Sequence, residues 1–167
     1  LAGISIDQIS RVTGASQVVR LMPSLTADIA QAVVGVCVPD NTEQNLSDAA
    51  YAIASAMGRA LAVPERLMHA VTAISGSGVA FVFEFIHAMA LGGTREGIPY
   101  PKALSAACQV VSGAANLLDS SGVHPTEMVS RVCSPAGTTV EGIAALAGGN
   151  FTRTVIDAVH AAAERSR

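Results

Sequence analysis

Tryptophan is absent from this chain of 167 residues, and aromatic residues make up only 4% of it. Charge is also scarce, because Asp, Glu, Lys and Arg together account for 14% of the residues and the net charge is −3. Single-stranded nucleic acids are bound by stacked aromatic rings, and phosphate backbones and acidic lipids are bound by clustered basic residues. The composition therefore argues against nucleic acid as a partner.

Cysteine is rare as well, with Cys37, Cys108 and Cys133 far apart in the sequence. No Cys-x-x-Cys pair and no closely spaced Cys/His set is present, so neither a zinc site nor a disulfide framework is predicted. Thiols of this kind are typical of proteins in a reducing compartment. We therefore expect a cytoplasmic protein without a metal.

A long uninterrupted apolar run is missing too. The longest one, 79–91, has thirteen residues and contains Glu84 and His87. Because a helix needs about 20 apolar residues to span a bilayer, we expect no membrane segment. Half of all residues are nevertheless apolar, and the predicted helix 78–96 is apolar nearly all round. Such a helix must be buried on every side, which predicts an intertwined dimer.

The apolar pattern changes its period near Pro64. Before it, strands are predicted at 17–22, 32–38 and 59–63 and helices at 5–10 and 42–57, which is typical of the closing half of an α/β sheet. After it, only helices are predicted, at 65–74, 78–96, 101–120, 125–133, 139–147 and 151–166. The predicted fold class is α/β followed by all-α, with domains at 1–64 and 65–167.

The segment 134–139, Ser-Pro-Ala-Gly-Thr-Thr, is a short loop that runs into a predicted helix. Gly137 is expected to provide backbone angles closed to other residues, and Thr138 with Glu141 forms a Thr-x-x-Glu capping box. The free N–H groups of such a helix start attract small anions. The alternative is a well-capped turn without a ligand.

Further motifs connect this loop with a known family. They are 20–23, Arg-Leu-Met-Pro; 72–78, Thr-Ala-Ile-Ser-Gly-Ser-Gly; and the stretch from Asn150-Phe151 to Glu164-Arg165-Ser166. In this order and spacing, the chain resembles pyrroline-5-carboxylate reductase over nearly all its residues. It departs from the family pattern at five positions, Ser24, Ala27, Val79, Phe81 and Ala136.

The resemblance implies the closing half of a Rossmann-like sheet followed by a helical dimerisation domain. It also implies reduction of the C=N bond of 1-pyrroline-5-carboxylate to proline with NADPH or NADH, in a homodimer or a higher oligomer of dimers. The Gly-x-Gly-x-x-Gly turn that binds the dinucleotide in such sheets does not occur in the sequence. We therefore expect a fragment that is inactive and does not bind dinucleotide by itself.

For the substrate, the resemblance implies that the backbone N–H groups of Ser134, Gly137 and Thr138 hold the carboxylate. The hydroxyl of Thr139 would bond the ring nitrogen, which makes Thr139 the catalytic candidate. Glu65 falls where the family has an acidic residue facing the substrate ring. The alternative for Glu65 is a carboxylate that only favours a helix start.

For the cofactor, Ala2 and Gly3 match the end of a strand that lies against the nicotinamide in the family. Arg131 falls where the family usually has asparagine near the nicotinamide ribose, and a solvated arginine is the alternative. Two other functions stay open. One is another reductase of small carboxylate-bearing imines or hydroxyacids, and the other is a dimerisation module without enzymatic activity.

Overall fold

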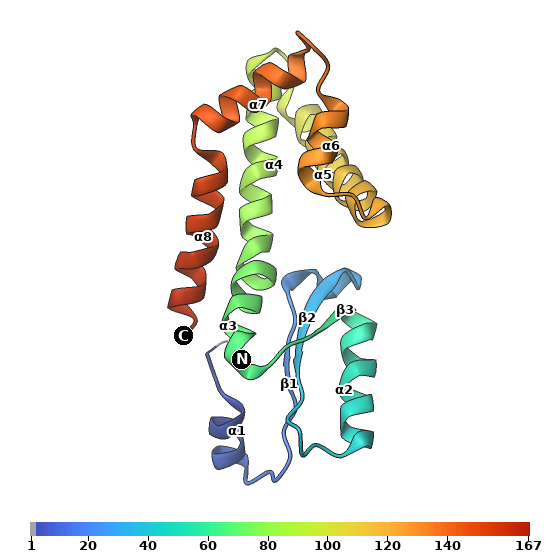
Figure 1. Ribbon diagram of the computed structural model, residues 1–167, viewed down its shortest axis with the longest axis vertical. Coiled ribbons are helices and arrows are strands. Elements are labelled where there is room, and N and C mark those ends of the chain that lie inside the picture. The colour runs from blue at the N-terminus through green and yellow to red at the C-terminus, as the bar shows by residue number, and fades with distance from the viewer. Residues whose placement is uncertain (1–2) are drawn as a thin grey trace. The chain divides into compact units, whose positions relative to one another are not determined.

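The computed structural model describes residues 3–167 (Figure 1). The chain forms two compact units. The first contains the described residues up to Phe81 together with 156–167, and the second contains 82–155. These units follow from contacts within the chain, and the domain boundary at Pro64 stays a prediction.

The first unit contains a three-stranded sheet in the order β1-β2-β3. Strand β1 (Arg20–Met22) is antiparallel to β2 (Ala32–Cys37), and β2 is parallel to β3 (Gly58–Ala62). Helix α1 (Ile6–Thr13) precedes the sheet, the 3-10 turn η1 (Leu25–Ile29) joins β1 to β2, and helix α2 (Gln44–Met57) joins β2 to β3. The predicted closing half of an α/β sheet is thus confirmed.

Strand β2 is buried on both of its faces, as the continuous apolar run of its sequence predicts. Val34 and Val36 pack against Ala54 of α2 on one face. On the other face Cys37 packs with Met68 and Val71, which belong to the short helix α3 (Met68–Val71). A methyl group at Gly35 would lie 2.8 Å from Val71 Cγ1, so glycine allows this helix to approach the strand closely.

No break separates the helices that were predicted at 65–74 and 78–96. After a 3-10 turn, η2 (Glu65–Leu67), and α3, the chain enters a π-helix, η3 (Thr72–Ser77), and continues as α4 (Gly78–Arg95). The Thr72 hydroxyl donates to the Met68 carbonyl at 2.9 Å and the Ser75 hydroxyl to the Val71 carbonyl at 2.8 Å. Both hydroxyls thus bond carbonyls one turn back along the helix.

Because these helical pieces are continuous, the stretch Glu65–Arg95 is 31 residues long. By length and composition alone it could cross a membrane, and only 11% of its most apolar window is buried within the described chain. The prediction that the apolar segment is too short to span a bilayer was therefore wrong about length, because the continuous helix begins well before Val79.

The second unit is helical, as predicted. It contains most of α4, then α5 (Tyr100–Ser121), α6 (Pro125–Val132), α7 (Thr138–Gly148) and the start of α8 (Phe151–Arg165). Within it, the rings of Phe85 and Phe151 lie 5.9 Å apart. His87 Nδ1 lies 2.9 Å from the Tyr100 hydroxyl.

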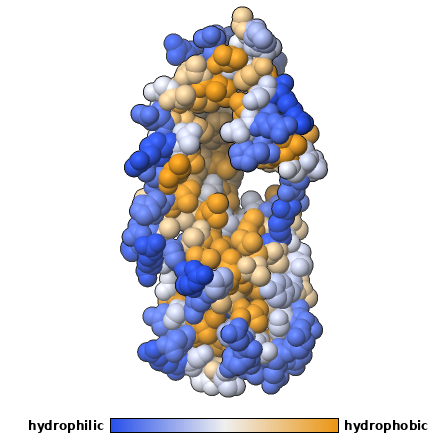
Figure 2. Space-filling view, viewed as in Figure 1, coloured by the Kyte–Doolittle hydropathy of each residue, from blue (hydrophilic) through white to orange (hydrophobic). Residues whose placement is uncertain are grey.

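Much of the apolar surface of this unit is exposed. On the visible face, apolar side chains gather over its helices (Figure 2). Of the apolar residues of this unit, Phe83 is 56% exposed, Leu91 50% and Leu117 56%. Thirteen large apolar residues of the unit are exposed in this way: Val82, Phe83, Leu91, Ile98, Val110, Leu117, Val129, Val132, Val140, Ile143, Leu146, Phe151 and Val155. Exposed apolar surface of this extent marks an interaction site.

Candidate active site

The loop between α6 and α7 is a four-residue turn. The Gly137 N–H donates to the Ser134 carbonyl at 3.0 Å, which closes the turn around Pro135 and Ala136. Ala136 has a φ of 56°, in the left-handed region. Proline followed by a left-handed residue is the pattern of a type II turn, whose third position is usually glycine. Ala136 therefore adopts this conformation at a cost.

Gly137 does not have the unusual backbone angles that were expected of it. Its φ is −81° and its ψ is 160°, which other residues adopt easily. A methyl group at this position would lie 2.3 Å from Ser134 Oγ and 3.0 Å from the Ser134 carbonyl oxygen. Glycine is required here because the turn brings Ser134 too close for any side chain.

The predicted capping box was also wrong. Helix α7 has Gly137 as its N-cap, with no side-chain hydrogen bond to the cap, and Thr138 is the first helical residue. The turn ends one residue earlier than the Thr-x-x-Glu pattern suggests, because Gly137 itself takes up the extended cap conformation. Thr139 consequently lies at the second helical position, where it is half-buried, while Thr138 is exposed. The first N–H groups of α7 have no helical acceptor and stay available to a ligand.

Replacing Ala136 by glycine should stabilise the protein by about 0.5–1 kcal/mol. The left-handed conformation costs alanine about 1–2 kcal/mol, and the greater freedom of glycine in the unfolded chain offsets part of the gain. We expect the melting temperature to rise by about 1–4 °C in thermal unfolding. As a matched control, Ala144→Gly in the exposed middle of α7 should lower stability by about 1 kcal/mol. Loss of stability in both variants would contradict the assigned turn.

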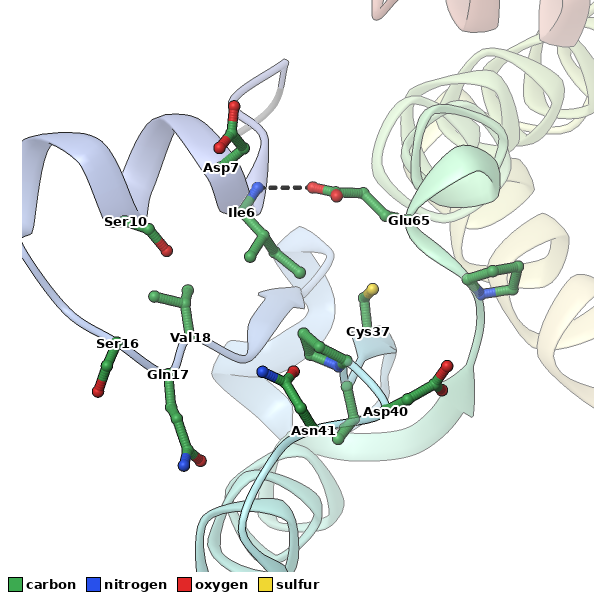
Figure 3. A pocket seen from close by; sticks show the side chains of 13 residues that line it. Ile6, Asp7, Ser10, Ser16, Gln17, Val18, Cys37, Asp40, Asn41 and Glu65 are labelled. Atoms are coloured by element: carbon green, nitrogen blue, oxygen red, sulfur yellow. Dashed lines mark hydrogen bonds between the residues drawn. The ribbon is translucent and has the colours of Figure 1, made fainter.

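Glu65 lies in the first unit, on the wall of a pocket of about 570 Å³ (Figure 3). Its Oε1 accepts the Ile6 N–H at 2.6 Å, at the start of α1, and lies 3.6 Å from Arg20 Nη1. The Arg20 side chain is only 10% exposed, whereas that of Glu65 is 38% exposed. These contacts are those of a carboxylate that fastens α1 and β1 together. A role of Glu65 towards the substrate stays a prediction.

Cys37 lines the same pocket. Burial raises the pKa of its thiol, and the negative charge of Glu65 raises it further, while Arg20 and a backbone hydrogen bond from Glu65 act in the opposite direction. The thiol is therefore held protonated near neutral pH, which does not suit a nucleophile. Among the described residues, no group of three or more His, Cys, Asp and Glu side chains could hold a metal ion.

The structure treats the three residues predicted to contact the cofactor, Ala2, Gly3 and Arg131, differently. Ala2 lies outside the described residues. Gly3 has a φ of 72° and lines a second pocket of the first unit. Arg131 Nη2 lies 2.7 Å from Glu127 Oε1 on α6, and both side chains are more than half exposed. This pair is that of a solvated arginine, and contact of Arg131 with a cofactor stays a prediction.

Three polar residues of the second pocket, Ser77, Arg165 and Ser166, have no role predicted from the sequence. In the sequence, Arg165 and Ser166 belong only to a family motif. Their signal was a charged and hydroxyl-bearing end to an otherwise alanine-rich helix. Only the structure shows that the end of α8 lies beside the π-helix within one unit.

A closing α/β sheet followed by a helical unit with exposed apolar faces defines a protein of two-part architecture. The family model "Pyrroline-5-carboxylate reductase dimerisation" matches residues 65–167, which is more than half of the chain. The chain belongs to the pyrroline-5-carboxylate reductase family.

Similar proteins extend over the first unit as well. The chain is 43% identical over 152 residues to a pyrroline-5-carboxylate reductase of Methanosarcina acetivorans, with 91% of the chain and 56% of the relative covered. It is 38% identical to that of a Synechocystis strain, with 100% and 62% covered. The chain thus spans about 60% of the length of these relatives.

Solved structures agree with the fold. A pyrroline-5-carboxylate reductase from Coxiella burnetii has a TM-score of 0.93 at 27% identity, covering 99% of the chain and 62% of that protein. The pyrroline carboxylate reductase of Plasmodium falciparum with NADP bound has a TM-score of 0.91 at 25% identity, covering 99% and 67%. The predicted fold class is confirmed over nearly the whole chain.

Proposed function

We propose that this chain supplies the closing part of the dinucleotide-binding sheet and the helical domain of a pyrroline-5-carboxylate reductase. The reaction is reduction of the C=N bond of 1-pyrroline-5-carboxylate to L-proline with NADPH or NADH, the last step of proline biosynthesis. The observation that carries the proposal is the turn 134–137 at the start of α7, in a chain whose relatives bear this name.

The loop has the donors that a small carboxylate needs. The N–H groups of Ser134, Gly137 and Thr138 bind the carboxylate, with Gly137 shared because its N–H also bonds the Ser134 carbonyl. The positive end of the α7 dipole favours the negative charge. Thr139, on the next position of the helix, places its hydroxyl at the ring nitrogen. A neutral imine needs little beyond orientation and a proton on its nitrogen, so a neutral hydroxyl is sufficient.

The fit with a nicotinamide cofactor is partial. Gly3 offers bare backbone, since even an added methyl group would meet nothing closer than the Ser166 carbonyl oxygen at 3.9 Å. The glycine-rich turn that holds the pyrophosphate of a dinucleotide does not occur in the 167 residues. A reduced nicotinamide, when bound, supplies hydride to the imine carbon. The chain itself contributes substrate binding and orientation.

The partner is a second copy of the chain. Apolar side chains of α4, α5, α6 and α7 are exposed in the second unit, and burial between two copies removes them from water. Little of the apolar stretch Glu65–Arg95 is buried within one chain. Burial against a second copy covers this stretch, so no membrane is needed. A homodimer in the cytoplasm, alone or as part of a larger oligomer, follows from this proposal.

The test is a chimera in which the segment that precedes the matched region in the Methanosarcina acetivorans relative is joined to this chain. The chimera should oxidise NADPH or NADH in the presence of pyrroline-5-carboxylate and form proline. The unjoined chain should show no binding of NADPH at micromolar concentration in calorimetry, because it lacks the pyrophosphate turn. A folded, dimeric chimera without reductase activity would contradict the proposed function.

A further inference from the structure

The second pocket of the first unit has a wall rich in hydrogen-bond donors. Its volume is about 470 Å³, within the range of small-molecule sites. It is lined from the π-helix by Thr72 and Ser77, from the end of α8 by Ala162, Arg165 and Ser166, and by the backbone of Gly3. All of these residues belong to the same compact unit, so the pocket is formed within one folded body.

The Ser166 hydroxyl in this pocket has no partner. Its Oγ is shut off from solvent and makes no hydrogen bond to any described residue. The backbone N–H of the same residue is satisfied, since it donates to the carbonyls of Ala162 and Ala163 at 3.2 and 3.1 Å. Buried hydroxyls are nearly always hydrogen-bonded in folded proteins. The donor of the Ser166 hydroxyl is therefore unused within the described chain.

Arg165 is the charged group of the pocket, and no carboxylate lines it. Among the described residues Arg165 has no ion pair, whereas the next arginine, Arg167, is paired with Glu164. The Thr72 hydroxyl is already used, because it donates to the Met68 carbonyl. The guanidinium of Arg165 and the hydroxyls of Ser166 and Ser77 are left as donors.

We propose that this pocket binds a small oxyanion, either a carboxylate or a phosphate. The planar guanidinium of Arg165 presents two parallel N–H groups that match two oxygens of either anion. The hydroxyls of Ser166 and Ser77 add two further donors. The inference does not rest on the proposed reductase function, whose carboxylate site is the loop of the second unit.

The test follows backbone amide NMR signals of the 167-residue protein during titration with sodium acetate and, separately, with inorganic phosphate. Sodium chloride keeps the ionic strength constant, and acetamide serves as the uncharged analogue of acetate. Saturable shifts are expected at Gly3, Ser77 and Ser166 with at least one of the two anions, and none with acetamide. Saturation by acetate alone identifies a carboxylate site, and saturation by phosphate alone identifies a phosphoryl site.

Point variants distinguish specific binding in the pocket from general attraction of anions to basic residues. Arg165→Gln should raise the dissociation constant at least about tenfold, since it removes the charged fork. Arg167→Gln, the matched control one residue beyond Ser166, should change it less than about twofold, because Arg167 does not line the pocket. Ser166→Ala should weaken binding about threefold or more through the lost donor.

Equal weakening by Arg165→Gln and Arg167→Gln would overturn the proposal, as would the absence of saturable shifts at the three pocket residues. If Arg165→Gln does not fold, Arg165→Lys keeps the charge and loses the planar fork. Binding by the lysine variant as tight as by the parent protein would then show that the fork is not used, and would equally overturn the proposal.

Discussion

Replacing Thr139 by valine should lower kcat/KM for pyrroline-5-carboxylate about thirty- to a thousandfold in the active chimera, with a nearly unchanged melting temperature. Valine keeps the shape of threonine and removes the hydroxyl that orients the ring nitrogen. Removing one positioned donor from an active site costs about 2–4 kcal/mol of transition-state stabilisation. Thr139 lies at the second helical position and makes no capping bond, so the helix loses little.

The neighbouring threonine is the matched control for this experiment. Thr138 begins α7, is exposed, and is proposed to act only through its backbone N–H. Thr138→Val should therefore stay within about threefold of the parent kcat/KM, because the backbone donor is retained. If Thr139→Val also stays within this range, Thr139 has a structural role and the loop acts only in carboxylate binding.

Replacing Phe83 by glutamate should abolish the dimer. Phe83 is 56% exposed on α4, so the change costs a monomer little. In a dimer that buries this helix, the new carboxylate would be desolvated without a partner. We expect the dimer dissociation constant to rise at least about a hundredfold, equivalent to about 2.7 kcal/mol. Analytical ultracentrifugation should show monomers or insoluble protein.

Val12 provides the control, since it is 88% exposed on α1 and does not belong to the helical unit. Val12→Glu places the same charge at another exposed apolar position and should leave the protein soluble and dimeric. A parent protein that sediments as a stable monomer would refute the dimer proposal. A dimer that survives Phe83→Glu would place the interface on other helices.

The sequence by itself determined the fold class and the order of elements. The apolar run of β2 and the helices after Pro64 were predictable because periodicity and the proline and glycine signals are local properties of the chain. The loop 134–139 was found for the same reason, since its proline, glycine and threonines stand next to one another. The motifs that carry the family resemblance are equally visible without coordinates.

Tertiary structure decided how the residues within these motifs are used. The turn is closed by the bond from the Gly137 N–H to the Ser134 carbonyl, and Gly137 is the N-cap of α7 in place of Thr138. The motif 72–78 continues as a π-helix, in which the hydroxyls of Thr72 and Ser75 bond carbonyls one turn back.

Contacts between distant segments were also decided only by the tertiary structure. Glu65 bonds the start of α1 and Arg20, 59 residues away from its partner Ile6. Arg165 and Ser166 meet Ser77 in one pocket although nearly ninety residues separate them in the sequence. Such pairings depend on how α8, the π-helix and the sheet pack against one another, and packing is fixed by the whole unit rather than by any local pattern.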